Sequence, residues 1–194
     1  LAVGCGYKFL NGGPGAPAFL YVAERHHASL QSPLGGWMGH ARPFEFVDGY
    51  EPAPGITRFL CGTPSILALS ALETGVDLHL RADMSLVAAK SRALAERFID
   101  LVESRCGSFG IELVGPPRGA ARGSHVSFRH PEAFAIVQAL IARNVIGDFR
   151  APDVMRFGLT PLYLRYADVD RAVDTLGAVM ESEAWRDPRL RVRG

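Results

Sequence analysis

Lys8 is one of only two lysines in a sequence of 194 residues that otherwise carries its basic charge on nineteen arginines. A lysine amine can attack a carbonyl carbon and form a Schiff base, whereas an arginine stays protonated and cannot. Glycines at positions 4, 6, 12, 13 and 15 flank this lysine, and they would let the backbone approach a ligand closely. Two interpretations stay open at this point: a nucleophile for carbonyl chemistry, or a solvated loop lysine.

Tyr7 stands directly before Lys8, so the two side chains would point in different directions if the segment were extended. The tyrosine hydroxyl is suited to hydrogen-bond a phosphate or to donate a proton, although the ring could equally serve packing. The stretch "NGGPG" at 11–15 matches neither of the common glycine-rich phosphate-loop patterns, and no helix is predicted after it. A tight turn before the next strand explains this stretch as well as a phosphate loop does.

Arg156 and Trp37 are two further side chains whose surroundings suggest more than packing. Arg156 lies in the apolar stretch "DVMRFGLTP", where its rigid guanidinium needs either an internal acidic partner or a substrate carboxylate. Trp37 lies between glycines in "GGWMGH", so its indole N–H could donate to an anion or its ring could pack. Together the residues favour a lysine-dependent carbonyl cofactor and a carboxylate substrate, without deciding the matter.

The composition, 48% hydrophobic and 21% charged with a formal net charge of +1, is typical of a globular protein and gives no reason to expect a polyanion-binding surface. No apolar run approaches the roughly 20 residues that span a bilayer, and no signal peptide is recognisable. Cys5, Cys61 and Cys106 lack metal-ligand spacing, and we expect buried, reduced thiols in a cytoplasmic protein. Adjacent His26 and His27 cannot present two ligands on one helix face, so no metal site is predicted.

The region before residue 76 is rich in glycine and proline. Its start, "LAVGCGYKFL", is typical of a strand that runs into a loop, and because it lacks an initial methionine we expect an upstream part of the protein. Residues 18–23 predict a buried strand, and residues 25–58 predict a long functional loop with several aromatic side chains. A helix is expected from Thr63, as its N-cap, to Gly75, which would close it.

From about residue 80 the pattern changes to that of a regular α+β domain. Apolar residues recur at helical spacing over 82–107, and strands and helices then alternate. The predicted strands are 111–116, 124–130, 145–150 and 154–163, and the further predicted helices are 131–144 and 167–186. We therefore place a domain boundary near 76–82.

Four segments, taken in order, resemble the kynureninase family. They are "GCGYKFLNGGPGAPAFLYV", "GWMGHARPFEF", "RFLCGTPSIL" and "RGSHVSFRHPEAFAIVQALIARNVIGDFRAPDVMRFGLTPLY". The resemblance runs nearly the length of the chain but covers only the C-terminal half of that family. It implies an α/β fold of the aspartate-aminotransferase type (fold type I). Residues 1–78 would be the end of the large domain that binds pyridoxal 5′-phosphate (PLP), and 79–194 a small α+β domain.

The resemblance also implies an activity and roles for single residues. Kynureninases use PLP to hydrolyse L-kynurenine to anthranilate and L-alanine, in tryptophan catabolism. By similarity, Lys8 would be the Schiff-base lysine, and Tyr7 would contact the phosphate and aid proton transfer. Trp37 and Thr63 would reach the phosphate held by the other subunit of a homodimer, and Arg156 would clamp the substrate's α-carboxylate.

The Gly62–Thr63 pair matches the bacterial type, which implies kynurenine rather than its 3-hydroxy form as substrate. The family's aspartate for the pyridine nitrogen, and further groups for phosphate and ring, would lie upstream of Leu1, so we expect the chain to work together with an N-terminal half.

Two alternatives remain. One is another lyase or a desulfurase of the same fold, which is disfavoured because no cysteine stands in an obvious flexible loop. The other is a non-catalytic remnant that only dimerises or binds a partner.

Overall fold

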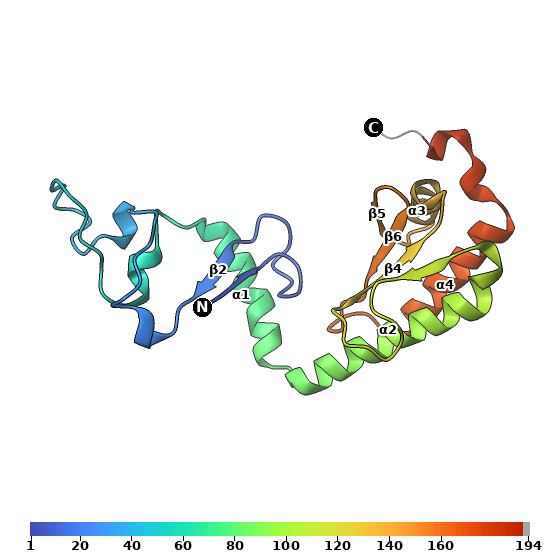
Figure 1. Ribbon diagram of the computed structural model, residues 1–194, viewed down its shortest axis with the longest axis horizontal. Coiled ribbons are helices and arrows are strands. Elements are labelled where there is room, and N and C mark those ends of the chain that lie inside the picture. Colours follow the sequence, from blue (N-terminus) through green and yellow to red (C-terminus); the bar gives the residue numbers. More distant parts are fainter. Residues whose placement is uncertain (192–194) are drawn as a thin grey trace. The chain divides into compact units, whose positions relative to one another are not determined.

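The computed structural model describes residues 1–191, and its contacts divide the chain into two units, Leu1–Ala82 and the part from Asp83 onward (Figure 1). Each unit is described by itself. None of the helices in the described residues is long and apolar enough to cross a membrane.

The first unit contains a two-stranded antiparallel sheet, one α-helix and a long irregular segment between them (Figure 1). In the sheet, Val3 pairs with Leu20 and Gly4 with Phe19. Short 3-10 helices interrupt the irregular segment. The elements are β1 (Ala2–Cys5), β2 (Ala18–Tyr21), η1 (Glu24–His26), η2 (Trp37–Gly39), η3 (Gly55–Phe59) and α1 (Ile66–Leu80).

The strand predicted at 18–23 exists as β2, but the prediction that it is buried was wrong. All four of its residues are exposed, including Phe19 at 45% and Tyr21 at 60%. Within residues 1–82, only Val22 and Ala53 are buried hydrophobic residues. The apolar sequence of β2 is therefore not matched by a second layer within this unit.

The helix predicted from Thr63 to Gly75 is shifted in the structure. Helix α1 starts at Ile66, with Ser65 as its N-cap residue, so Thr63 does not cap it. Gly75 lies inside the helix and is buried, because the chain at Leu10 passes so close that no side chain fits there.

The second unit is a four-stranded antiparallel sheet with three α-helices, in the strand order β3-β4-β6-β5. Helices α2 and α4 pack on each other, and α3 packs against β5 and β6. The elements are α2 (Met84–Cys106), η4 (Gly107–Phe109), β3 (Glu112–Val114), β4 (His125–Arg129), α3 (Ala133–Ile141), β5 (Asp148–Arg150), β6 (Val154–Gly158), α4 (Tyr166–Glu181), η5 (Ala184–Arg186) and η6 (Pro188–Leu190).

The predicted order of strands and helices in this unit is confirmed. Val126 and Phe128, predicted on one face of their strand, are both fully buried, and Phe98 of α2 packs on Phe128 and on Phe157 of β6. The last predicted helix was too long: α4 stops at Glu181, because Glu183 turns the chain into the left-handed region at φ 52°.

Candidate cofactor and substrate site

Lys8 lies on a small loop closed by backbone hydrogen bonds. The N–H of Gly12 donates to the carbonyl of Gly6 at 3.0 Å, which ties the two ends of the loop together. Inside the loop, the N–H of Asn11 donates to the carbonyl of Lys8 at 3.0 Å. Asn11 makes this turn at φ 58°, a conformation that asparagine tolerates better than most residues. The backbone of the lysine is therefore held, while its side chain is exposed.

The Lys8 ammonium lies 4.9 Å from the centre of the Tyr7 ring. The segment bends here, so the condition under which the two side chains would point apart is not met, and they come together. Attraction between the ammonium and the ring face favours this arrangement. Tyr7 is 45% exposed, so both groups are open to a ligand.

The "NGGPG" stretch forms a tight turn that leads towards β2. The N–H of Ala16 donates to the carbonyl of Gly13 at 3.1 Å, and Gly13 and Gly15 both have positive φ, 73° and 89°. Only glycine adopts this conformation without cost. Of the two interpretations, a phosphate loop or a tight turn, the backbone geometry gives direct evidence for the turn.

Trp37 and Thr63 are brought into one neighbourhood by a backbone contact. A Cβ atom on Gly36 would lie 1.8 Å from the carbonyl oxygen of Cys61, so the chain before Trp37 passes directly against the chain before Thr63. Trp37 is 46% exposed, and Thr63 is exposed and not committed to capping α1. The segment 24–63 that carries both lies apart from the loop that follows β1 (Figure 1).

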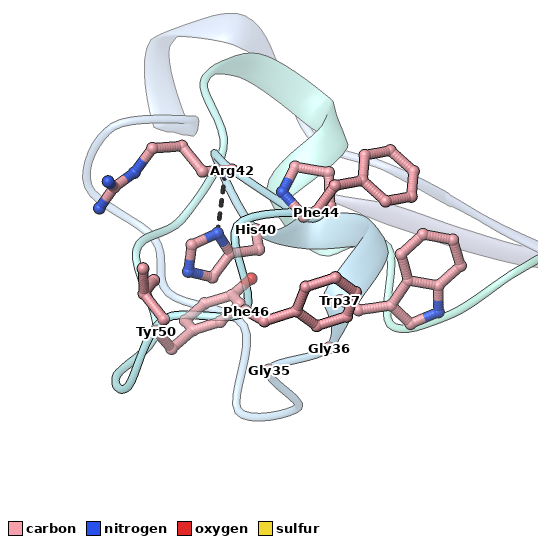
Figure 2. Close-up of a pocket in the computed structure, with 10 residues that line it drawn as sticks. Gly35, Gly36, Trp37, His40, Arg42, Phe44, Phe46 and Tyr50 are labelled. Atoms are coloured by element: carbon pink, nitrogen blue, oxygen red, sulfur yellow. Dashed lines mark hydrogen bonds between the residues drawn. The ribbon is translucent and has the colours of Figure 1, made fainter.

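An aromatic pocket of about 500 Å³ lies beside Trp37 (Figure 2). Trp37 meets Phe44 edge to face at 5.8 Å, and His40 meets Tyr50 in the same way at 5.6 Å. The backbone N–H of Arg42 donates to Nδ1 of His40 at 2.8 Å, drawn dashed in Figure 2, which leaves Nε2 as the donor of the neutral ring. Such a pocket suits a flat apolar group.

The sequence indicated this pocket only indirectly. Several aromatic residues in a long predicted loop were the sequence feature that indicated it. Nothing in the sequence indicated that His40 takes part.

Arg156 forms an ion pair across two strands of the second unit. It stands opposite Asp148 in the pairing of β6 with β5, and its Nε and Nη2 atoms donate to the Asp148 carboxylate at 3.1 and 2.6 Å. Within residues 1–191, no hydrogen bond uses its third nitrogen, Nη1. The side chain is 36% exposed. The internal ion pair is therefore present, and it leaves one edge of the guanidinium for a second anion.

The ion pair also sets the charge of Asp148. Burial raises the pKa of this carboxyl, but hydrogen bonds from Arg156 and Arg150 outweigh that effect and hold the pKa below its ordinary value. Asp148 is therefore a carboxylate at neutral pH, and it keeps the guanidinium of Arg156 in one orientation.

The three cysteines are free thiols, but only Cys106 is buried, so the expectation of three buried thiols was wrong. Burial raises the pKa of the Cys106 thiol and disfavours the nucleophilic thiolate. Cys61 is exposed and lies outside any helix or strand, which weakens the earlier argument against a desulfurase. In the described residues, no group of three or more His, Cys, Asp or Glu is arranged to hold a metal ion.

Comparison with known proteins gives the family. The family described as kynureninase C-terminal domain matches residues 87–176. The chain is 50% identical over 192 residues to the kynureninase of Burkholderia mallei (strain SAVP1), covering 99% of the chain and 46% of that enzyme. It is 53% identical over 180 residues to the kynureninase of Deinococcus radiodurans, covering 93% of the chain and 44% of that enzyme. The chain corresponds to the C-terminal half of a kynureninase.

Similar solved structures give the fold. A cysteine desulfurase from Thermococcus onnurineus matches with a TM-score of 0.73 at 18% identity, covering 93% of the chain and 46% of that protein. The Escherichia coli cysteine desulfurase CsdA matches with a TM-score of 0.67 at 19% identity, covering 93% of the chain and 46% of that protein. The predicted fold class, fold type I of the PLP enzymes, is confirmed, and the chain spans about half the length of these relatives.

The residues of the first unit fit part of a PLP site by their chemistry. The exposed Lys8 amine suits an aldehyde carbon, and the hydroxyl of Tyr7, the indole N–H of Trp37 and the hydroxyl of Thr63 suit phosphate oxygens. All of these side chains are exposed.

Proposed function

We propose that the chain supplies the lysine and the carboxylate clamp of a kynureninase, which hydrolyses L-kynurenine to anthranilate and L-alanine with PLP. The observation that carries this proposal is the hydrogen-bonded loop that presents the Lys8 amine beside Tyr7. The 50% identity to named kynureninases over 99% of the chain supports it. Because the chain covers 46% of those enzymes, the activity belongs to the chain together with an N-terminal half.

PLP, when bound, supplies an electron sink for carbanion character at the substrate's α-carbon. The Lys8 amine would hold the cofactor through its aldehyde carbon and, once released by substrate, would take the α-proton at its Nζ atom. The Tyr7 hydroxyl would bind a phosphate oxygen or pass a proton near the same amine, a role supported by the contact between its ring and the Lys8 ammonium. Both residues are exposed, so closure of the site would come from other parts of the enzyme.

Arg156 would bind the substrate's α-carboxylate with the edge of the guanidinium that Asp148 does not use. The bonds to Asp148 engage Nε and Nη2, and within the described residues the two N–H groups of Nη1 remain for an incoming carboxylate. A guanidinium favours this role because its donors are fixed in one plane. The ion pair with Asp148 orients that plane before substrate arrives.

Trp37 and Thr63 would donate to the phosphate of the cofactor held by the other subunit of a homodimer. Their common neighbourhood, built on the Gly36–Cys61 contact, and its separation from the Lys8 loop in Figure 1 are consistent with action at a second site. The Gly62–Thr63 pair favours kynurenine over the 3-hydroxy form as substrate.

The exposed apolar surface of the first unit supports the need for an N-terminal half. Leu67 of α1 is 86% exposed and Leu20 of β2 is 42% exposed, in segments that are apolar by sequence. Exposed apolar patches of this kind commonly mark an interface. Purified alone, the chain should not hold PLP tightly.

The test is borohydride trapping of PLP, together with kynurenine turnover, in the chain assembled with its N-terminal half. Lys8→Arg keeps the charge but should abolish both the trapped adduct and turnover, by a factor of about 10³ or more for turnover. Lys90→Arg, the same change at the other lysine, is the matched control and should leave both unchanged. Turnover that survives Lys8→Arg, or an adduct at another residue, would refute the assignment.

The alternatives are decided by the same preparation. A desulfurase that uses the exposed Cys61 would convert cysteine to alanine and leave its sulfur as a persulfide on Cys61, from which an added thiol reductant would release sulfide. Cys61→Ser would lose that activity, and kynurenine would not be turned over. A non-catalytic remnant would assemble with its partner but would trap no PLP at Lys8.

A further inference from the structure

One face of helix α1 packs directly against the loop that carries Lys8. Leu72, Gly75 and His79 stand three and four residues apart, and this spacing places them on the same side of a helix. We call these three residues the support face. Each of them meets a different part of the loop, so the contacts fix its position at three points.

Gly75 gives the closest of the three contacts. A Cβ atom at this position would lie 2.1 Å from the carbonyl oxygen of Leu10, a distance that no real contact shows. Glycine inside a helix costs about 1 kcal/mol relative to alanine, so the helix gives up some stability here. What it gains is direct contact between its own backbone and the backbone of the loop.

Leu72 packs where the loop closes. Its methyl groups lie 2.8 and 2.9 Å from the place that a Cβ on Gly6 would take, and 2.9 Å from that on Gly12. Gly6 and Gly12 are the two residues joined by the closing hydrogen bond. The leucine side chain therefore fills the space at the base of the loop, and any side chain at either glycine would displace it.

His79 supports the residue next to the lysine. It is 8% exposed, and its ring lies 5.5 Å from the ring of Phe9. Its Nδ1 is 2.8 Å from the carbonyl of Gly75, and because a carbonyl can only accept, Nδ1 carries the hydrogen. Its Nε2 is buried without a hydrogen-bond partner in the described residues. The hydrogen bond fixes the ring in place, and the contact made by the ring is packing against Phe9.

We propose that the support face of α1 is a positioning device for the Lys8 amine, and that Gly75 and His79 are positioning residues of the reaction. This rests on the proposed function, in which Lys8 holds the cofactor. A loop rich in glycine has many conformations open to it, and the three contacts select one of them. Displacement of a reacting group by about 1 Å can lower a rate about 100-fold, so a small shift of this loop is enough to slow the reaction.

The first experiment compares Gly75→Ala with Gly177→Ala in the PLP-loaded enzyme assembled with its N-terminal half. Both changes replace a helical glycine by alanine, but a Cβ at Gly177 would meet only the Cys106 sulfur, at an ordinary 3.9 Å. The measurements are the pH titration of cofactor absorbance, the rate of borohydride trapping at Lys8, and kcat and KM. Gly75→Ala should shift the titration, slow trapping and lower kcat about 100-fold with little change in KM, while Gly177→Ala should match the unmodified enzyme.

The second experiment uses the ring of His79. His79→Ala removes the contact with Phe9 and should shift the same titration. It should lower kcat about 10-fold, a smaller loss of positioning than the one expected for Gly75→Ala. His79→Phe keeps a ring of similar size and has no nitrogen to leave unpaired, so it should restore both. This pair decides the question if Gly75→Ala does not give soluble enzyme.

The outcomes separate the two proposals. If the unmodified enzyme forms no trapped adduct at Lys8, the proposed function fails. If the adduct forms at Lys8 but Gly75→Ala titrates and turns over like Gly177→Ala, or His79→Ala like His79→Phe, the positioning role is overturned while the proposed function stands.

Discussion

The two units of the chain use apolar residues in opposite ways. The unit from Asp83 onward buries them in one cluster, with Phe98, Phe128 and Leu94 almost fully excluded from solvent. The unit Leu1–Ala82 has apolar segments too, but most of the exposed large hydrophobic side chains of the described chain belong to it. The unit from Asp83 onward completes its own hydrophobic core. The unit Leu1–Ala82 needs another part of the protein to cover its apolar residues.

The difference shows which unit of the chain can fold without a further covering layer. A two-stranded sheet is marginal in water unless a further layer covers it, and β1–β2 has both strands largely exposed. The second unit has four strands, three helices and a continuous core. The residues proposed for the cofactor are all in the first unit, while Arg156, the proposed clamp, is in the second.

The largest expected effect comes from separating the two units. A fragment of residues 83–194 should fold alone and unfold cooperatively, because its core lies within it. A fragment of residues 1–82 should not, because it has almost no buried apolar residues. Circular dichroism during urea unfolding measures both. A cooperative transition for 1–82 on its own would break the comparison.

A smaller effect is expected from single truncations in the two units. Phe98→Ala should lower the free energy of unfolding of the second unit by about 3–5 kcal/mol, since this ring is fully buried between two others. Leu67→Ala on α1, at a residue that is 86% exposed, should change stability in the isolated chain by less than about 0.5 kcal/mol.

The same two variants should then be measured after assembly with the N-terminal half. There the cost of Leu67→Ala should rise while that of Phe98→Ala stays the same. Equal costs for Leu67→Ala in both states would mean that α1 is not covered by that half.

The smallest expected effect is a pH dependence confined to the second unit. Hydrogen bonds from Arg165, together with its charge and that of Arg171, lower the pKa of Asp168 at the start of α4 from 3.8 to about 2. The carboxylate therefore stabilises the folded state at pH values above its unfolded pKa, and this is lost as the pH falls from about 4 to about 2. Asp168→Asn should lower the melting temperature of the 83–194 fragment at pH 7, and the gap should close towards pH 2. A gap that is the same at both pH values would contradict this.

The sequence was sufficient to predict the elements of the second unit, because the spacing of its apolar residues reflects the hydrophobic core within that unit. Val126 and Phe128 alternate on β4 as predicted, and both are buried. The same rules failed for β2, because an apolar strand indicates that a partner layer exists without saying which part of the protein supplies it. They also failed for Gly75, because glycine as a helix end and glycine as a close contact look the same in sequence.

For the candidate site, the residue types suggested a chemistry but not the geometry. The rarity of lysine pointed to Lys8, and the glycines around Trp37 pointed to an indole N–H that could donate to an anion. The ion pair of Arg156 with Asp148 was an open alternative, since the register of β5 with β6 could not be derived from the sequence. The support face was not predicted, because it joins residues sixty or more positions apart.

The contact between Gly36 and Cys61 has a consequence for changing the protein. Between these two points the chain is also joined at His40 and Pro52, and the N–H of Ala53 donates to the carbonyl of Gly39 at 2.8 Å. The stretch from 42 to 50 is therefore a loop closed at its base. A peptide tag inserted after Asp48 would lengthen the tip and leave the base in place, which makes this loop a suitable attachment point for a label that reports on the neighbouring tryptophan.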